Sequence, residues 1–245
     1  MKFFLAPMQG LTGYTVRNAF HHHFDYIDKY YTPFIPAAKR MNAKIKRDID
    51  PINNDGITLI PQAMSIVADE VIDLHRQLVP YGYDEINVNL GCPSGTVVSK
   101  KRGSGILAYP DMLDSFLDEL YTKADFPVSI KTRVGFNDDE LWPRLIEIYS
   151  KYPISELTVH PRVQKDFYKN TPRMDDFALA MQKINPDKTT LCYNGDITDI
   201  NSFNALTDCF PDIDEIMIGR GLFANPALIA ELKGISRIKP SFASA

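Results

Sequence analysis

Short apolar runs alternate with longer segments of helical periodicity along the whole chain. Runs rich in β-branched and aromatic side chains are typical of buried strands, whereas apolar residues spaced three and four apart are typical of amphipathic helices. The predicted strands are Phe3–Ala6, Tyr26–Tyr30, Thr58–Gln62, Glu85–Asn89, Val128–Lys131, Glu156–His160, Thr189–Tyr193 and Glu215–Ile218. The predicted helices are Thr12–His22, Ala68–Val79, Asp111–Thr122, Asp138–Tyr149, Phe177–Lys183, Asp199–Thr207 and Pro226–Leu232, with a less regular segment between Pro36 and Asp50.

The alternation predicts an α/β fold. Strand and helix follow one another in eight units, which favours a (β/α)8 TIM barrel of parallel strands over a doubly wound sheet. No linker rich in Pro, Gly or Ser divides the chain, and its 245 residues match the usual barrel length of about 250. We therefore expect one barrel domain over residues 1–234, followed by a short tail at 235–245.

Polar or glycine-rich groups follow seven of the eight predicted strands. In a barrel, the loops after the strands meet at the C-terminal mouth, where active sites lie. These groups are Pro7-Met8-Gln9-Gly10, Gln62, Asn89-Leu90-Gly91-Cys92-Pro93, Lys131-Thr132-Arg133, His160-Pro161-Arg162, Asn194-Gly195-Asp196 and Gly219-Arg220-Gly221. The sequence therefore predicts an active site at this mouth.

The last two of these groups are typical of a phosphate site. Glycine lets the backbone approach a phosphate closely, and Arg220 can add a charge-assisted hydrogen bond. Either group alone also suits an ordinary turn, but their position after strands seven and eight favours phosphate binding. In contrast, Gly103-Ser104-Gly105 lacks a third glycine and does not follow a strand, so it does not predict a dinucleotide-binding loop.

Lys131 and Cys92 are the candidate reactive groups. Lys131 would carry its ammonium into the mouth, where a buried cation needs an anionic partner such as a reduced flavin. Cys92 lies between Gly91 and Pro93, where packing gives no reason for a thiol. A thiol of ordinary pKa is protonated at neutral pH and can donate a proton. Cys192 lies inside a predicted strand and Cys209 at the end of a helical pattern, and both are expected to be small buried apolar residues.

Composition excludes several classes of protein. Apolar residues make up 44% of the chain and charged residues 24%, which rules out disordered and collagen-like chains. No apolar run is long enough to span a membrane, and the apolar N-terminus ends at Pro7, too early for a secretory signal. Three cysteines fit a cytoplasmic protein without disulfides or a zinc site. We expect the triplet His21–His23 to be solvated, and we predict no metal site.

Net charge argues against a protein that binds nucleic acid over its whole surface. There are 27 Lys and Arg against 31 Asp and Glu, a net charge of −4. Basic clusters occur nevertheless, at Lys39–Arg40, Lys44–Arg47, Lys100–Arg102 and between Arg162 and Arg173. Each cluster alone is more typical of a solvated face than of a binding site.

The motifs together resemble the tRNA-dihydrouridine synthase family. They are Leu5 to Gly10, Asn87 to Pro93, Ser129 to Arg133, Val159 to Arg162, Tyr193 to Ile197 and Met217 to Gly221. The resemblance extends from Leu5 to about Gly234, and the Asn-x-Gly-Cys-Pro motif is its most specific part. It implies a barrel that binds FMN, reduction of FMN by NADPH, and reduction of the C5–C6 bond of a uridine in tRNA.

The resemblance also implies residue roles. Residues implied to contact the flavin ring or its chain are Pro7, Met8, Gln9, Gln62, Lys131 and His160, and those implied to hold its phosphate are Asn194, Gly195, Asp196, Gly219 and Arg220. Asn89, Arg133 and Arg162 would contact substrate. Hydride from flavin N5 would add at C6, and Cys92 would donate the proton to C5.

The chain differs from the family in one respect. Family members usually carry a helical domain after the barrel that helps to seat tRNA, and only residues 235–245 follow the last predicted unit here. Either the barrel loops hold RNA, another copy or partner supplies the surface, or the substrate is a free pyrimidine or another small activated alkene. A non-enzymatic RNA-binding relic, in which flavin is vestigial, is the remaining hypothesis. The sequence leaves open the target uridine, NADPH against NADH, and the oligomeric state.

Overall fold

A computed structural model describes residues 1–24, 26–38 and 40–235 of the chain. Its strands are β1 Lys2–Leu5, β2 Lys29–Tyr31, β3 Ile35–Pro36, β4 Leu59–Ile60, β5 Gln62–Met64, β6 Ile86–Leu90, β7 Val128–Gly135, β8 Glu156–Val163, β9 Thr190–Tyr193 and β10 Glu215–Ile218. They form one sheet in the order β3-β5-β6-β7-β8-β9-β10-β1-β2-β4. Every pair of neighbours is parallel.

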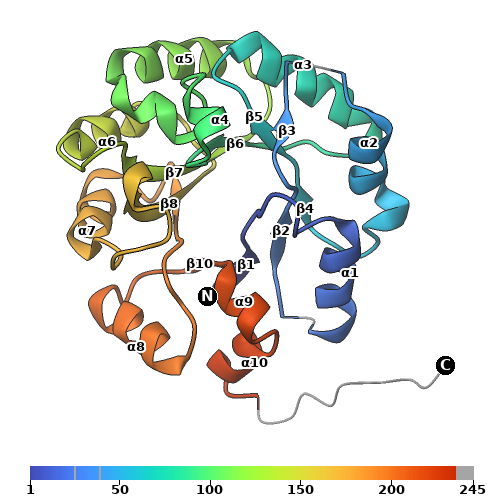
Figure 1. Ribbon diagram of the computed structural model, residues 1–245, viewed down its shortest axis with the longest axis vertical. Coiled ribbons are helices and arrows are strands. Elements are labelled where there is room, and N and C mark those ends of the chain that lie inside the picture. Colours follow the sequence, from blue (N-terminus) through green and yellow to red (C-terminus); the bar gives the residue numbers. More distant parts are fainter. Residues whose placement is uncertain (25, 39, 236–245) are drawn as a thin grey trace.

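The sheet closes on itself, and two of its strands are each interrupted. β4 and β5 are separated only by Pro61, whose missing N–H breaks the ladder, and β2 continues into β3 after three residues. β4 pairs with β2, whereas β5 pairs with β3 and β6. The ten segments are therefore eight staggered strands of a closed barrel, which Figure 1 shows end on. The predicted (β/α)8 fold is confirmed.

Helices surround the barrel (Figure 1). They are α1 Tyr14–His23, α2 Ala43–Ile49, α3 Ala68–Leu78, α4 Gly95–Val98, α5 Pro110–Lys123, α6 Trp142–Ser150, α7 Met174–Lys183, α8 Ile200–Cys209, α9 Arg220–Ala224 and α10 Leu228–Leu232. Short 3₁₀ turns lie at η1 Pro51–Asn53, η2 Val79–Tyr81, η3 Gly103–Ala108 and η4 Gln164–Asp166. α3 shows why these segments are helical: Val71, Leu74 and Leu78 recur at helical spacing and are fully buried against the sheet.

Some predicted boundaries were wrong. The second strand begins at Lys29 rather than Tyr26, and β7 and β8 continue to Gly135 and Val163. Arg133 and Arg162 end the apolar runs in the sequence, yet both side chains are buried inside these two strands. Cys209 is exposed, contrary to expectation, whereas Cys192 is buried as expected.

Charged side chains close the barrel at the end opposite the mouth. Glu156, at the start of β8, is 3% exposed. Its carboxylate accepts hydrogen bonds from Lys29 Nζ at 2.7 Å, the Tyr31 hydroxyl at 2.7 Å and the Thr158 hydroxyl at 2.8 Å. Because this end is filled and bonded internally, the opposite end of the barrel is left to hold a ligand.

Parts of two predictions lie outside the described residues, namely Lys39 and positions 236–245 of the expected tail. In the part of the chain that the structure describes, no helix is long and apolar enough to cross a membrane, and no group of His, Cys, Asp and Glu side chains could hold a metal ion.

Candidate active site

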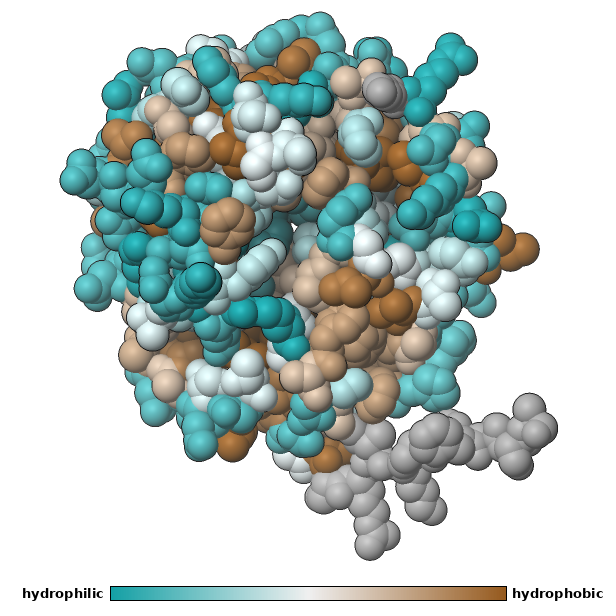
Figure 2. All heavy atoms as spheres, viewed as in Figure 1, coloured by the Kyte–Doolittle hydropathy of each residue, from teal (hydrophilic) through white to brown (hydrophobic). Residues whose placement is uncertain are grey.

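A cavity of about 540 Å³ opens at the C-terminal ends of the strands. In Figure 2, a hollow lies near the centre of the face in view. Of the fifteen residues predicted to form the site, fourteen line this cavity: Pro7, Met8, Gln9, Gln62, Asn89, Cys92, Lys131, Arg133, His160, Asn194, Gly195, Asp196, Gly219 and Arg220. Seven segments distant in sequence thus converge on one space, and Arg162 is the predicted residue left outside it.

Cys92 lies in the loop between β6 and α4 and is partly buried. Its backbone N–H donates to Asn89 Oδ1 at 2.9 Å. Burial raises the pKa of the Cys92 thiol, although the backbone N–H of Ser94 and the charges of Arg133 and Lys131 oppose this. Since the thiol is protonated at neutral pH, it can act as a proton donor toward a group in the cavity.

A chain of side-chain amides runs beneath Cys92. Asn89 Nδ2 donates to Gln62 Oε1 at 2.8 Å, and Gln62 Nε2 donates to Asn87 Oδ1 at 2.8 Å. Asn87 in turn donates to the Ser129 hydroxyl at 3.0 Å. These bonds fix which way each amide faces. Each NH₂ group keeps a second hydrogen, so Asn89 and Gln62 can still donate to a carbonyl oxygen of a ligand.

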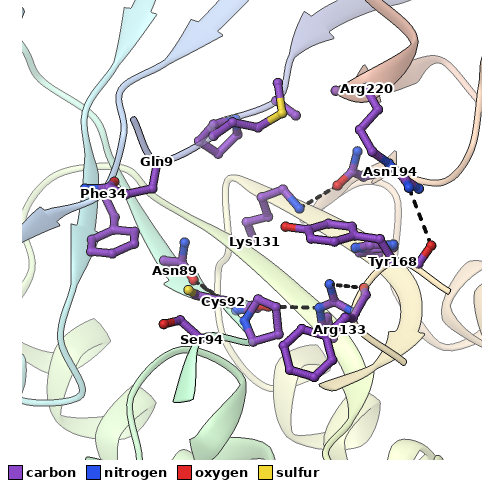
Figure 3. A pocket seen from close by; sticks show the side chains of 18 of the residues that line it. Gln9, Phe34, Asn89, Cys92, Ser94, Lys131, Arg133, Tyr168, Asn194 and Arg220 are labelled. Atoms are coloured by element: carbon purple, nitrogen blue, oxygen red, sulfur yellow. Dashed lines mark hydrogen bonds between the residues drawn. The ribbon is translucent and has the colours of Figure 1, made fainter. Parts of the chain in front are cut away.

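Lys131 is a partly buried amine at the end of the cavity near β9. Its Nζ donates to Asn194 Oδ1 at 2.5 Å (Figure 3). Burial, and then the charge of Arg133, lower the pKa of Lys131 to about 7. Among the residues that the structure describes, no carboxylate forms an ion pair with Lys131. The cavity therefore offers a place for an anionic group.

His160 is a neutral donor or acceptor rather than a charged one. It is 7% exposed, and burial together with the charges of Arg133, Lys131, Arg162 and Arg220 lowers its pKa well below the usual value. Arg162 Nη1 donates to His160 Nε2 at 3.1 Å, which assigns the remaining ring proton to Nδ1. The imidazole is thus held in one tautomer.

Arg162 lies outside the cavity and contacts two of the residues that line it. Its side chain is 1% exposed, and its guanidinium donates to the Lys169 carbonyl at 3.0 Å, the Asn170 carbonyl at 2.5 Å and both oxygens of Asp196. A substrate contact would require these bonds to open, so this placement does not support the predicted contact. The side chain instead orients His160 and Asp196.

Arg133 lines the cavity, but its guanidinium already donates hydrogen bonds to the backbone. It donates to the carbonyls of Gly91 at 2.9 Å, Val163 at 2.9 Å and Phe167 at 2.7 Å. It therefore joins the loop of Cys92 to the loop after β8 (Figure 3). Because its donors hold backbone, what Arg133 offers a ligand is positive charge at close range rather than a free fork of N–H groups.

The predicted phosphate end packs too tightly for side chains at two glycines. A Cβ at Gly195 would lie 1.9 Å from the Tyr193 hydroxyl, and a Cβ at Gly221 would lie 2.1 Å from the Ile197 carbonyl oxygen. Between them, Asp196 accepts from Arg220 Nη2 at 2.6 Å. Its carboxylate is anionic, so it orients Arg220 and leaves phosphate contacts to backbone N–H groups and to the arginine.

Sequence reasoning missed the aromatic residues of the cavity. Phe34, Phe167 and Tyr168 line it, and the Tyr168 ring lies 5.0 Å from the Arg220 guanidinium carbon and 5.6 Å from that of Arg133. The adjacent Phe167-Tyr168 pair in a basic segment was the available signal. The reach of that loop back over the barrel depends on Arg133, which no local pattern reveals.

Comparison with known proteins agrees with this geometry. The model of the family described as dihydrouridine synthase (Dus) matches residues 4–243. The chain belongs to this family. It is 26% identical to tRNA-dihydrouridine synthase B of Pasteurella multocida (strain Pm70) over 243 residues, 96% of this chain and 69% of that protein. It is 30% identical to tRNA-dihydrouridine synthase B of Escherichia coli (strain K12) over 165 residues, 67% of this chain and 50% of that protein.

Other relatives are matched over shorter segments. A probable tRNA-dihydrouridine synthase of Staphylococcus aureus (strain N315) is 34% identical over 154 residues, 61% of this chain. The matched region is 46% of that protein, so this dihydrouridine synthase-family chain spans between about half and two thirds of the curated relatives named here.

Solved structures share the fold at low identity. TcOYE with pHBA aligns with a TM-score of 0.67 and 7% identity, over 98% of this chain and 90% of that one. Morphinone reductase aligns with a TM-score of 0.63 and 10% identity, over 95% and 85%. At these identities the likeness concerns the barrel alone.

Proposed function

We propose that this chain is an FMN-dependent oxidoreductase that reduces the C5–C6 double bond of a uridine in tRNA to dihydrouridine. The observation that carries the proposal is that the Cys92 thiol and the partly buried Lys131, which has no ion-pair partner among the described residues, line one cavity. Reduction of an activated C=C bond needs a proton donor on the substrate side and charge stabilisation on the side of the reductant.

The donor set of the cavity fits FMN. Lys131 supplies a cation for the electron-rich side of a reduced isoalloxazine ring, and Gln62 keeps a free N–H for its pyrimidine edge. The backbone around Gly195 and Gly219, with Arg220, suits the phosphate. When bound, FMN would supply a hydride to the pyrimidine, and we propose NADPH as its reductant.

The chain's own residues then perform the binding and the proton transfer. Asn89 would donate from Nδ2 to a carbonyl of the target uracil while its Oδ1 holds the backbone of Cys92. The thiol would deliver its proton to C5. His160, held neutral, would hydrogen-bond near the flavin without adding a charge. Arg133 would place positive charge beside the substrate.

For tRNA, we propose contacts from lysines exposed on the loops that border the cavity. Lys100 and Lys101 follow the Cys92 loop, and Lys165 and Lys169 flank Phe167 and Tyr168. Phosphate neutralisation by such lysines gives salt-dependent affinity. The target uridine must leave its stack to enter a cavity of this depth. The reducing cytoplasm remains the proposed location, in keeping with three free cysteines.

The deciding experiment compares wild type with Cys92→Ala. The variant should bind FMN and turn yellow like the wild type, yet form dihydrouridine in tRNA at least about 100-fold more slowly, because a positioned general acid contributes ~10²–10⁴-fold. Cys209→Ala removes an exposed thiol away from the cavity and serves as the matched control. A Cys92→Ala rate equal to wild type would refute the proton-donor role.

A second measurement separates tRNA from a small substrate. Reduced, protein-bound flavin is mixed with tRNA lacking dihydrouridine or with free uridine, and its reoxidation is followed by absorbance. Fast reoxidation by tRNA alone supports the proposal. Reoxidation by free uridine but not tRNA would replace it with a reductase of small alkenes, and a colourless protein that takes up no FMN would favour a non-enzymatic RNA-binding role.

A further inference from the structure

The backbone of Cys92 is held on both sides. Its N–H donates to Asn89 Oδ1 at 2.9 Å, and its carbonyl oxygen accepts two hydrogen bonds from Ser104, from the backbone N–H at 3.1 Å and from the hydroxyl at 2.8 Å. Ser104 is fully buried and does not line the cavity. Its hydroxyl therefore has a defined partner in the cysteine and no role in contacting a ligand.

The residue before Ser104 packs directly against the cysteine. Gly103 has φ +55°, and a Cβ there would lie 2.7 Å from the Cys92 carbonyl oxygen and 3.0 Å from Cys92 Cβ. A side chain at position 103 would push the thiol-bearing residue out of place. The left-handed backbone and the close approach both require glycine here.

This segment is itself braced from the barrel. Arg102 Nη2 donates to Glu70 Oε2 at 3.2 Å, and the buried Ser65 hydroxyl donates to the same oxygen. Ser65 follows β5 and Glu70 lies in the first turn of α3, so the turn that carries Ser104 is tied to regular elements. The Cys92 loop thereby packs against a segment that is fixed to the barrel.

We propose that Ser104, seated by Gly103, is the positioning residue that holds the Cys92 thiol in the cavity for proton donation. The proposal rests on the proposed function for its catalytic consequence. Because the backbone N–H and carbonyl of Cys92 are both hydrogen-bonded, the thiol can move only by rotation about the Cα–Cβ bond, and it stays partly buried. Loss of the Ser104 hydroxyl leaves the carbonyl with the single, longer bond at 3.1 Å and frees the loop to move toward solvent.

The test measures the thiol directly and separately from catalysis. In a Cys209→Ser background, which removes the exposed thiol, the rate of Cys92 alkylation by iodoacetamide is measured against pH for wild type, Ser104→Ala and Gly103→Ala. Ser99→Ala is the matched control, since its hydroxyl bonds the Thr96 carbonyl in the same segment. FMN uptake and thermal melting establish that each variant is folded.

In Ser104→Ala and Gly103→Ala, the Cys92 thiol should be alkylated about three- to tenfold faster at pH 7, the range that corresponds to one lost hydrogen bond. The midpoint of the alkylation rate against pH should move down because the thiol is less buried. Dihydrouridine formation should fall in kcat by at least a similar factor with KM for tRNA unchanged, whereas Ser99→Ala should match wild type. Alkylation profiles of both folded variants identical to wild type would overturn the proposal. If the wild type formed no dihydrouridine, the proposed function would fail, and the alkylation profiles would still show whether Ser104 and Gly103 position the Cys92 thiol.

Discussion

Replacing Lys131 by Met should stabilise the FMN-free protein while weakening its binding of FMN. The pKa of Lys131 is lowered from 10.5 to about 7, because the folded protein surrounds the ammonium with low polarity and the charge of Arg133. At about 1.4 kcal/mol per tenfold change in acid dissociation, this corresponds to roughly 5 kcal/mol of unfavourable free energy in the folded state, an upper limit because the cavity opens to solvent.

The sign of the effect depends on pH. Below pH 7 the lysine is protonated in the folded and unfolded states, and the full cost applies. Between pH 7 and 10.5 the folded protein loses the proton that the unfolded chain keeps, so the stability of the FMN-free protein rises with pH. Lys131→Met should therefore raise the free energy of unfolding by up to roughly 5 kcal/mol at pH 6 and by about 2 kcal/mol at pH 9.

Binding of FMN should change in the opposite direction. Loss of one charge-assisted hydrogen bond of about 1.5–3 kcal/mol predicts an affinity for FMN that is weaker by roughly 10- to 100-fold. Urea unfolding of the FMN-free protein at the two pH values and quenching of FMN fluorescence measure the two effects. Lys188→Met, which removes an exposed lysine, is the control. A Lys131→Met protein that is less stable at both pH values, or that binds FMN as tightly as wild type, would refute the reasoning.

Two further predictions concern the Lys29–Glu156 pair at the closed end of the barrel and Gly221 at the predicted phosphate end. Lys29→Met should lower the free energy of unfolding by about 3 kcal/mol, since it leaves the buried Glu156 carboxylate without its cation. Adding Glu156→Gln should restore most of the lost stability, measured by urea unfolding. A double variant no more stable than Lys29→Met would contradict the pairing of Lys29 with Glu156. Gly221→Ala should lower stability by more than about 2 kcal/mol and weaken FMN binding, because its Cβ would lie 2.1 Å from the Ile197 carbonyl oxygen. Gly95→Ala, with nothing within 4 Å, should leave thermal melting and FMN titration unchanged, and equal behaviour of the two alanine variants would disprove the steric argument.

The two arginines at the ends of apolar runs show where sequence reasoning stopped. Polar residues after a strand indicate the mouth of a barrel, which is where Arg133 and Arg162 were expected, and the family resemblance implied that they contact substrate. Both lie inside extended strands. The guanidinium of Arg133 is bonded to the carbonyls of Val163 and Phe167, which are distant in sequence, and that of Arg162 to the carbonyls of Lys169 and Asn170 in the segment after its own strand. Which backbone carbonyls reach Arg133 depends on long-range closure, and no local pattern encodes it.

The sequence by itself determined the parallel barrel, because strand and helix periodicities are local properties of the chain, and it determined that polar and glycine-rich groups end the strands on one side. Tertiary structure alone decided the chemical state of those groups. Lys131 has a lowered pKa and Cys92 a raised one because the closed barrel shields both in part from water. The same closure lets Ser104 reach the Cys92 carbonyl. Burial and orientation depend on neighbours distant in sequence, which exist only after folding.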